Sequence, residues 1–270
     1  MLRERVITAL VLLVLFLGAL FLLPALGWAM LIIVIVLQGT SEWVRLAKLS
    51  PVTGRIYWYL TLVLMCLLVW FDSISGLSQQ FIPHLAIYVL SLMLWMMVPV
   101  WMAVGRKVEQ PVLLMLVGWA LLIPTGLAMM DLRRDSPWVL LGIIGLVWVA
   151  DIAAYFVGRK FGKNKLAPSI SPGKTWEGVF GALCGVSVYV LLIWTFSDNL
   201  RYYLFIPNIL IASWCWVGLA VMGDLFESAV KRQAGVKDSG SLLPGHGGLL
   251  DRIDALTSTL PLAALTMLVQ

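Results

Sequence analysis

This sequence is poor in charged residues, cysteine and histidine, and each shortage excludes a class of protein. Only 12% of its 270 residues are charged and 61% are hydrophobic, which excludes an ordinary soluble domain and indicates a chain with many membrane spans. The three cysteines, Cys66, Cys184 and Cys215, fall in apolar runs, so we expect small buried side chains and no disulfide framework. With two histidines, His84 and His246, the chain has no Ser-His-Asp order, Cys-His pair or zinc spacing. A covalent mechanism therefore has no support.

Nine apolar runs predict an all-α, polytopic integral membrane protein with about nine transmembrane helices. The boundaries carry an uncertainty of about 2–4 residues. The first two runs are separated only by Pro24 and Gly27, so a single merged span remains an alternative. The runs are Val6–Leu23, Trp28–Leu46, Ile56–Phe71, His84–Val104, Val112–Met130, Trp138–Val157, Trp176–Phe196, Phe205–Glu227 and Ile253–Val269.

Basic residues indicate how the spans are oriented. With nine spans and a cytosolic N-terminus, all of the 19 Lys and Arg residues lie in inside segments except Arg133, Arg134 and Arg201. This positive-inside bias predicts a cytosolic N-terminus and an outside C-terminus. We also expect a bacterial-type inner membrane, with the active site on its cytosolic side. The net charge of +5 then reflects loops that face anionic lipid and an anionic substrate, with no need for nucleic acid.

Aromatic side chains lie near many predicted span ends. Because Trp favours the membrane interface, we expect an aromatic belt, and we expect His84 to be interfacial as well. The tryptophans near span ends are Trp28, Trp43, Trp70, Trp101, Trp138 and Trp176.

The two halves of the chain differ in kind. Residues 1–137 are spans joined by short loops, which predicts a membrane scaffold. Residues 138–270 hold most of the acids near the cytosolic ends of spans, together with two basic, Gly- and Pro-containing connections at 158–175 and 228–252. Ionisable groups are costly beside hydrocarbon, so we expect the catalytic region in this second half.

Asp224 begins a helical face that combines three kinds of polar group. Ser228 is four residues further on and Lys231 seven, so both share its face, and Glu227 is a near neighbour. The alternative is an ordinary helix end with solvated charges. A single helix face that presents an acid, a hydroxyl and a cation indicates a functional site more than an ordinary helix end.

Asp251 and Asp254 open the last predicted span, with Arg252 between them. One acid at a helix start would suit the helix dipole, so capping is the alternative interpretation. Two acids favour a metal, and Mg²⁺ prefers a few carboxylates with water and phosphate oxygens. If the preceding loop folds back, Asp224 and Asp251 share this ion.

Glycines follow Pro244 in the order Gly245, His246, Gly247, Gly248. Their main-chain amides can approach a phosphate closely. His246 is predicted to hydrogen-bond a phosphate, to assist proton transfer, or to order the loop, and these alternatives stay open.

The other connection ends in Ser171-Pro-Gly-Lys-Thr175, which is half of a phosphate-binding loop. It lacks the full GxxxxGK[ST] pattern and a preceding strand, so a P-loop nucleotide fold is rejected. Lys174 and the amides of a helix N-terminus can still hold a triphosphate. Asp151 is expected to face this connection.

The stretch from Ser228 resembles the signature of the phosphatidate cytidylyltransferases (CDP-diacylglycerol synthases). That signature is S-x-x-K-R, K-D, P-x-H-G-G and D-R-x-D, matched by Ser228, Lys231–Arg232, Lys237–Asp238, Pro244, His246–Gly248 and Asp251–Asp254. The upstream segments 223–228 and 171–178 also look like this family, and the resemblance covers nearly the whole chain.

The resemblance implies transfer of CMP from CTP to phosphatidic acid, which forms CDP-diacylglycerol and pyrophosphate. It also implies a helical membrane fold, a homodimer, dependence on Mg²⁺, a metal centre at Asp224 and Asp251, and room for a monovalent cation such as K⁺ beside it. The expected catalytic residues are Asp224, Asp251, Lys231, Arg232, Lys237, Asp238 and His246, and the expected metal ligands are Asp224, Asp251 and Asp254. The expected substrate-binding residues are Asp151, Ser171, Lys174, Thr175, Ser228, Gly247, Gly248 and Arg252.

Three other interpretations remain. A secondary transporter would also carry intramembrane acids, although paired halves and acids near the midplane would be expected there. A different enzyme acting on another lipid phosphate or on a lipid alcohol would have a related site. A purely structural protein would not need so many charges.

Overall fold

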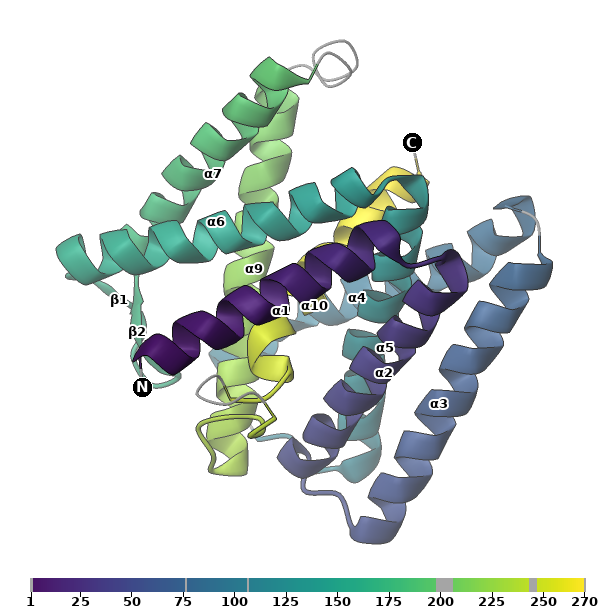
Figure 1. Ribbon diagram of the computed structural model, residues 1–270. Coiled ribbons are helices and arrows are strands. Elements are labelled where there is room, and N and C mark those ends of the chain that lie inside the picture. The colour runs from purple at the N-terminus through teal and green to yellow at the C-terminus, as the bar shows by residue number, and fades with distance from the viewer. Residues whose placement is uncertain (1, 76, 106, 198–205, 243–246, 270) are drawn as a thin grey trace.

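The computed structural model describes residues 2–75, 77–105, 107–197, 206–242 and 247–269. These residues form nine α-helices and one small two-stranded sheet, which confirms the all-α prediction (Figure 1). The elements are α1 (Leu2–Leu22), α2 (Ala25–Leu46), α3 (Pro51–Ile74), α4 (Leu77–Val104), α5 (Pro111–Asp135), α6 (Pro137–Phe161), β1 (Lys165–Ala167), β2 (Ser171–Thr175), α7 (Trp176–Phe196), α9 (Ile206–Ala234) and α10 (Leu250–Leu268).

Seven of these helices, α2 to α7 and α9, are long and apolar enough to cross a membrane. The protein is therefore polytopic. The first two predicted runs form separate helices, because α1 ends at Leu22 and α2 begins after Pro24. The total of nine spans and the cytosolic N-terminus stay predictions.

The helices pack around two hydrophobic cores that share α6 and α9. The larger core contains buried side chains of α1 to α6, α9 and α10, and the smaller one contains buried side chains of α6, α7 and α9. In Figure 1, α6 and α7 diverge on one side, while α2, α3 and α5 lie on the other. α6 and α9 therefore link the two cores.

Buried tryptophans tie these helices together by hydrogen bonds. Trp28 Nε1 donates to the Met129 carbonyl at 3.1 Å, and Trp43 Nε1 donates to the Leu114 carbonyl at 2.8 Å. Such bonds matter because lipid tails are as apolar as leucine and give helices little hydrophobic drive to associate. The expected aromatic belt is wrong for Trp28 and Trp43, whose side chains are buried.

Other side chains near span ends do face outward. Trp70, Trp138 and Trp176 are exposed on the helix surfaces, as expected for a belt. The cysteines were expected to be buried, and that expectation is wrong: Cys66 on α3, Cys184 on α7 and Cys215 on α9 are all exposed. Small apolar side chains lose nothing by facing lipid, so position in a span did not determine burial.

His84, expected at the membrane interface, is buried between two acids near the ends of α3 and α5. Its Nε2 lies 2.9 Å from Asp72 Oδ1 and its Nδ1 lies 2.8 Å from Asp131 Oδ2. Tyr88 donates to Asp131 at 2.6 Å, and Arg134 pairs with Asp131 at 3.1 Å. We call these five residues the far-end cluster. It joins the C-terminal ends of α3 and α5 to α4.

The 158–175 connection contains a short hairpin where the sequence predicted only a loop. β1 and β2 pair antiparallel, with Lys165 opposite Thr175 and Ala167 opposite Ser171. Thr175 then caps α7, because its hydroxyl accepts a hydrogen bond from the Gly178 amide at 3.2 Å. The hairpin therefore presents Lys174 immediately before a helix N-terminus.

Candidate active site

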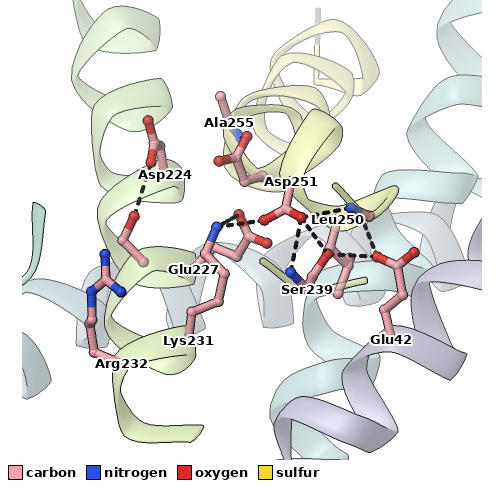
Figure 2. Close-up of polar contacts among 12 residues, drawn as sticks. Glu42, Asp224, Glu227, Lys231, Arg232, Ser239, Leu250, Asp251 and Ala255 are labelled. Carbon is pink, nitrogen blue, oxygen red and sulfur yellow. Dashed lines mark hydrogen bonds and ion pairs between the residues drawn. The ribbon is translucent and has the colours of Figure 1, made fainter. Parts of the chain in front are cut away.

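The C-terminal half of α9 presents acids, a hydroxyl and a cation, as its spacing predicted. Ser228 Oγ donates to Asp224 Oδ1 at 3.3 Å, and Lys231 Nζ donates to Glu227 Oε2 at 3.3 Å. Figure 2 shows Asp224, Glu227 and Lys231 along this helix, with Asp251 facing Lys231 from α10. Helical periodicity places these side chains on neighbouring faces.

The hairpin contributes a second cation to the same site. Lys174 Nζ lies 2.6 Å from Asp224 Oδ2, so the 158–175 connection reaches the acid that begins the functional face of α9. Asp151 on α6 interacts electrostatically with Asp224, Lys174 and Arg252. Two predicted substrate-binding residues, Lys174 and Asp151, thus interact with one predicted metal ligand.

Asp251 is held by four hydrogen bonds at the start of α10. Oδ1 accepts from Lys231 Nζ at 2.6 Å, while Oδ2 accepts from the Ser239 amide at 2.9 Å and the Gly248 amide at 2.8 Å. Ser239 Oγ also lies 3.0 Å from Oδ2. Burial raises the pKa of Asp251, but the hydrogen bonds from Lys231, Gly248 and Ser239 outweigh burial, so its pKa lies below the ordinary value of 3.8.

Asp254 lies one turn further along α10, beside Glu227 and within electrostatic reach of Asp224. The two helices approach closely here because Gly223 has no side chain. A Cβ at that position would lie 2.6 Å from the Asp254 carbonyl oxygen and 2.8 Å from Ser258 Oγ. We call Lys174, Asp224, Glu227, Lys231, Asp251 and Asp254 the carboxylate–lysine cluster.

The donor chemistry of this cluster fits Mg²⁺, because carboxylate oxygens are its usual protein ligands. Lysine ammonium groups already lie at Asp224 and Asp251, where a cation is therefore favoured. The acids do not form a ready cage, however. Within the described ranges, the one group of three His, Cys, Asp or Glu ligand atoms within 4.8 Å of one another is Asp72, His84 and Asp131.

Other predicted residues lie at the edge of the site. Lys237, Asp238 and Arg252 are exposed, and Ser171 is the first residue of β2. Arg232 Nε lies 3.5 Å from the Ile170 carbonyl oxygen, which brings it to the turn of the hairpin. His246 lies outside the described residues.

Two predicted phosphate contacts have other partners in this structure. The Gly248 amide donates to Asp251, and the Thr175 hydroxyl caps α7. Gly247 adopts a φ of +81°, a conformation that favours glycine, so it permits the turn into α10.

Two residues of the site escaped the sequence reasoning. Glu42 on α2 is fully buried, and it accepts hydrogen bonds from Ser239 Oγ at 2.7 Å and from the Leu249 and Leu250 amides at 2.9 Å each. Figure 2 shows Glu42 facing Ser239 and the start of α10. The available signal for Glu42 was its charge within an apolar run. Ser239 gave no signal of its own.

A polytopic helical fold with acids and lysines gathered at helix ends defines a membrane protein suited to phosphate chemistry. The profile of the Cytidylyltransferase family matches residues 3–269, and the chain belongs to that family.

Curated relatives cover almost the whole chain. A phosphatidate cytidylyltransferase of Pseudomonas aeruginosa is 37% identical over 98% of this chain and 96% of its own. One of Haemophilus influenzae is 36% identical over 97% and 96%. One of Staphylococcus haemolyticus is 44% identical over 48% of this chain and 49% of its own. Family membership sets aside the transporter and the purely structural interpretations.

Proposed function

We infer that this protein transfers CMP from CTP to phosphatidic acid, giving CDP-diacylglycerol and pyrophosphate, and so serves phospholipid biosynthesis. The family match and the two relatives that span the chain support this reaction. The observation that carries the assignment to a site is the Lys174–Asp224 contact of 2.6 Å. It joins the 158–175 connection to the acid that begins the functional face of α9.

The reaction is an in-line displacement. An oxygen of the lipid phosphate forms a bond to the α-phosphorus of CTP, the bond from that phosphorus to the bridging oxygen breaks, and pyrophosphate leaves. Such a step requires positioning and charge neutralisation more than a protein nucleophile. Lys174, Lys231, Arg232 and Lys237 are proposed to neutralise phosphate oxygens, and Ser228 and Arg252 to orient the substrates.

Mg²⁺ is proposed as the cofactor, held by Asp224 and Asp251 with Asp254 close by. A bound Mg²⁺ would neutralise triphosphate charge and stabilise the leaving pyrophosphate. Lys174 and Lys231 would then turn from these carboxylates towards phosphate oxygens. Asp238 and His246 are proposed to order the loop or handle protons. We also propose that a K⁺ ion binds beside the Mg²⁺ and that the protein is a homodimer. Its membrane is proposed to be a bacterial-type inner membrane, with the site on the cytosolic side.

The test is direct. Purified protein with Mg²⁺, labelled CTP and phosphatidic acid should yield a labelled liponucleotide, and a panel of other lipid phosphates and lipid alcohols should yield less. No product beside an active control enzyme would reject the proposal. If another lipid acceptor gave more labelled product than phosphatidic acid, that acceptor would replace phosphatidic acid as the proposed substrate.

The metal ligands have their own test. Asp224→Asn and Asp251→Asn should each lower turnover by at least about a thousandfold, in line with the loss of a group that organises a transition state. Both variants should keep a cooperative melting transition. Near-normal turnover in either variant would remove that residue from the metal site.

A further inference from the structure

Glu42 lies in the first half of the chain, yet its side chain is part of the signature loop's hydrogen-bond network. The Glu42 carboxylate is fully buried and accepts four hydrogen bonds, from Gln38, Ser239, Leu249 and Leu250. Three of these donors belong to the segment that leads into α10. A buried carboxylate needs such donors, since an unpaired charge there would be strongly destabilising.

The first consequence concerns the start of α10. Leu249 stands at the N-cap of this helix, and its own side chain makes no cap hydrogen bond. Glu42 supplies the missing acceptor from α2, because it binds the Leu249 and Leu250 amides at 2.9 Å each. A carboxylate is favoured at a helix N-terminus by the orphan amides and the helix dipole. Asp251 is the next residue, so its backbone position follows from this anchor.

The second consequence concerns one proton. Ser239 Oγ lies 2.7 Å from Glu42 Oε2 and 3.0 Å from Asp251 Oδ2. A hydroxyl has one hydrogen to donate, so it serves one carboxylate at a time. When the hydrogen goes to Glu42, an Asp251 lone pair becomes available to a cation, and Ser239 Oγ presents its own lone pairs to that side.

We propose that Glu42 is a positioning residue for Asp251. It anchors the N-terminus of α10 and accepts the Ser239 hydrogen, which leaves Asp251 available for a divalent cation. The proposal rests on the proposed function, because it concerns the metal ligand of that reaction. Gly248 fits this role, since a Cβ there would collide with both Ser239 Oγ and Glu42 Oε2.

The main variant is Glu42→Gln, with Thr40→Val as its matched control. Thr40 is equally buried on α2, but its hydroxyl donates within its own helix, to the Val36 carbonyl. Glu42→Gln should raise the Mg²⁺ concentration for half-maximal rate about tenfold, the size expected for one hydrogen bond to a charged group. Thr40→Val should change it less than twofold.

A second readout needs no turnover. Mg²⁺ or Mn²⁺ alone should raise the melting temperature of the unmodified protein, followed by tryptophan fluorescence, and Glu42→Gln should shrink that rise. Ser239→Ala tests the route of the effect. Because part of the coupling passes through the hydroxyl, adding Glu42→Gln to Ser239→Ala should raise the Mg²⁺ concentration for half-maximal rate by clearly less than the tenfold expected with Ser239 in place. If Glu42→Gln does not fold, Glu42→Asp takes its place. Aspartate keeps the charge but is too short to reach the same donors, so this variant should raise the Mg²⁺ concentration for half-maximal rate severalfold.

Two outcomes would overturn the proposal. The first is that Glu42→Gln, or Glu42→Asp in its place, needs the same Mg²⁺ concentration for half-maximal rate as Thr40→Val. The other is a tenfold effect that persists unchanged in the Ser239→Ala background. Failure of the proposed function is recognised separately, because then the unmodified protein itself makes no liponucleotide.

Discussion

Gly223 lies where α9 and α10 approach closely, and its replacement by alanine tests whether this approach positions the acids of the site. The added Cβ would lie 2.6 Å from the Asp254 carbonyl oxygen and 2.8 Å from Ser258 Oγ. The first of these atoms is backbone and cannot rotate away. Ordinary contact between such atoms requires more than 3 Å, so the two helices must separate.

The size of the effect follows from this geometry. We expect the helices to move apart by about 0.5–1 Å, and a misplacement of about 1 Å can lower a rate about a hundredfold. Overpacking of this kind costs about 1–3 kcal/mol of stability. Asp224 follows Gly223 directly and Asp254 lies opposite, so turnover should fall by about 10- to 100-fold while most of the protein stays folded.

The assay is liponucleotide formation from labelled CTP, with melting followed by tryptophan fluorescence. Gly218→Ala is the matched control on the same helix, since a Cβ at Gly218 has no atom within 4 Å. It should keep turnover within about twofold, because surface substitutions away from special contacts act weakly. If Gly223→Ala were as active as Gly218→Ala, close packing of α9 on α10 would not control the site.

Three further results are expected. Lys174→Met removes the cation beside Asp224 and should raise the KM for CTP about tenfold, the weight of one charge-assisted contact. Lys165→Met, at an exposed position of β1, should not raise it. Equal KM values for the two variants would refute a triphosphate role for Lys174. Asp131→Asn should lower stability by about 2–4 kcal/mol, because it strips a charged partner from buried His84, yet leave turnover per folded molecule unchanged; an unaltered melting curve would contradict this. The lowered pKa of Asp251 means that its stabilising effect is complete above its ordinary pKa of 3.8 and is lost as the pH falls towards the lowered value. The melting-temperature gap between the unmodified protein and Asp251→Asn should therefore narrow below about pH 4, and a constant gap would refute the shift.

The sequence predicted the helices and much of the site because both depend on local spacing. Apolar runs located the spans, and the four-residue interval placed Ser228 on the face of Asp224, where the hydroxyl and carboxylate meet at 3.3 Å. The signature resemblance identified Lys231 and Asp251, which pair at 2.6 Å. The four-residue interval works because helix geometry is regular. The signature works because its residues lie together in one segment of the chain.

Contacts between distant segments were not predictable in this way. Glu42 and Ser239 are separated by 197 positions, and nothing in either neighbourhood indicates the other. The burial of Trp28 and Trp43 was missed for a related reason, since an aromatic ring near a span end suits either an interface or a core. Only tertiary packing decides between them.

The Glu42 contacts and the far-end cluster lie near opposite ends of α5. Trp43, next to Glu42, donates to Leu114 near the start of α5, whereas Asp131 lies near its end. At 1.5 Å per residue, about 25 Å of helix separates those two points. Lipid gives helices little hydrophobic reason to keep one register, so buried polar contacts at both ends hold it. The far-end cluster fixes α3, α4 and α5 at one end, and Glu42 fixes α2 to α10 at the other. A substitution in the far-end cluster should thus loosen the bundle as a whole, while a substitution at Glu42 should act on Asp251 first.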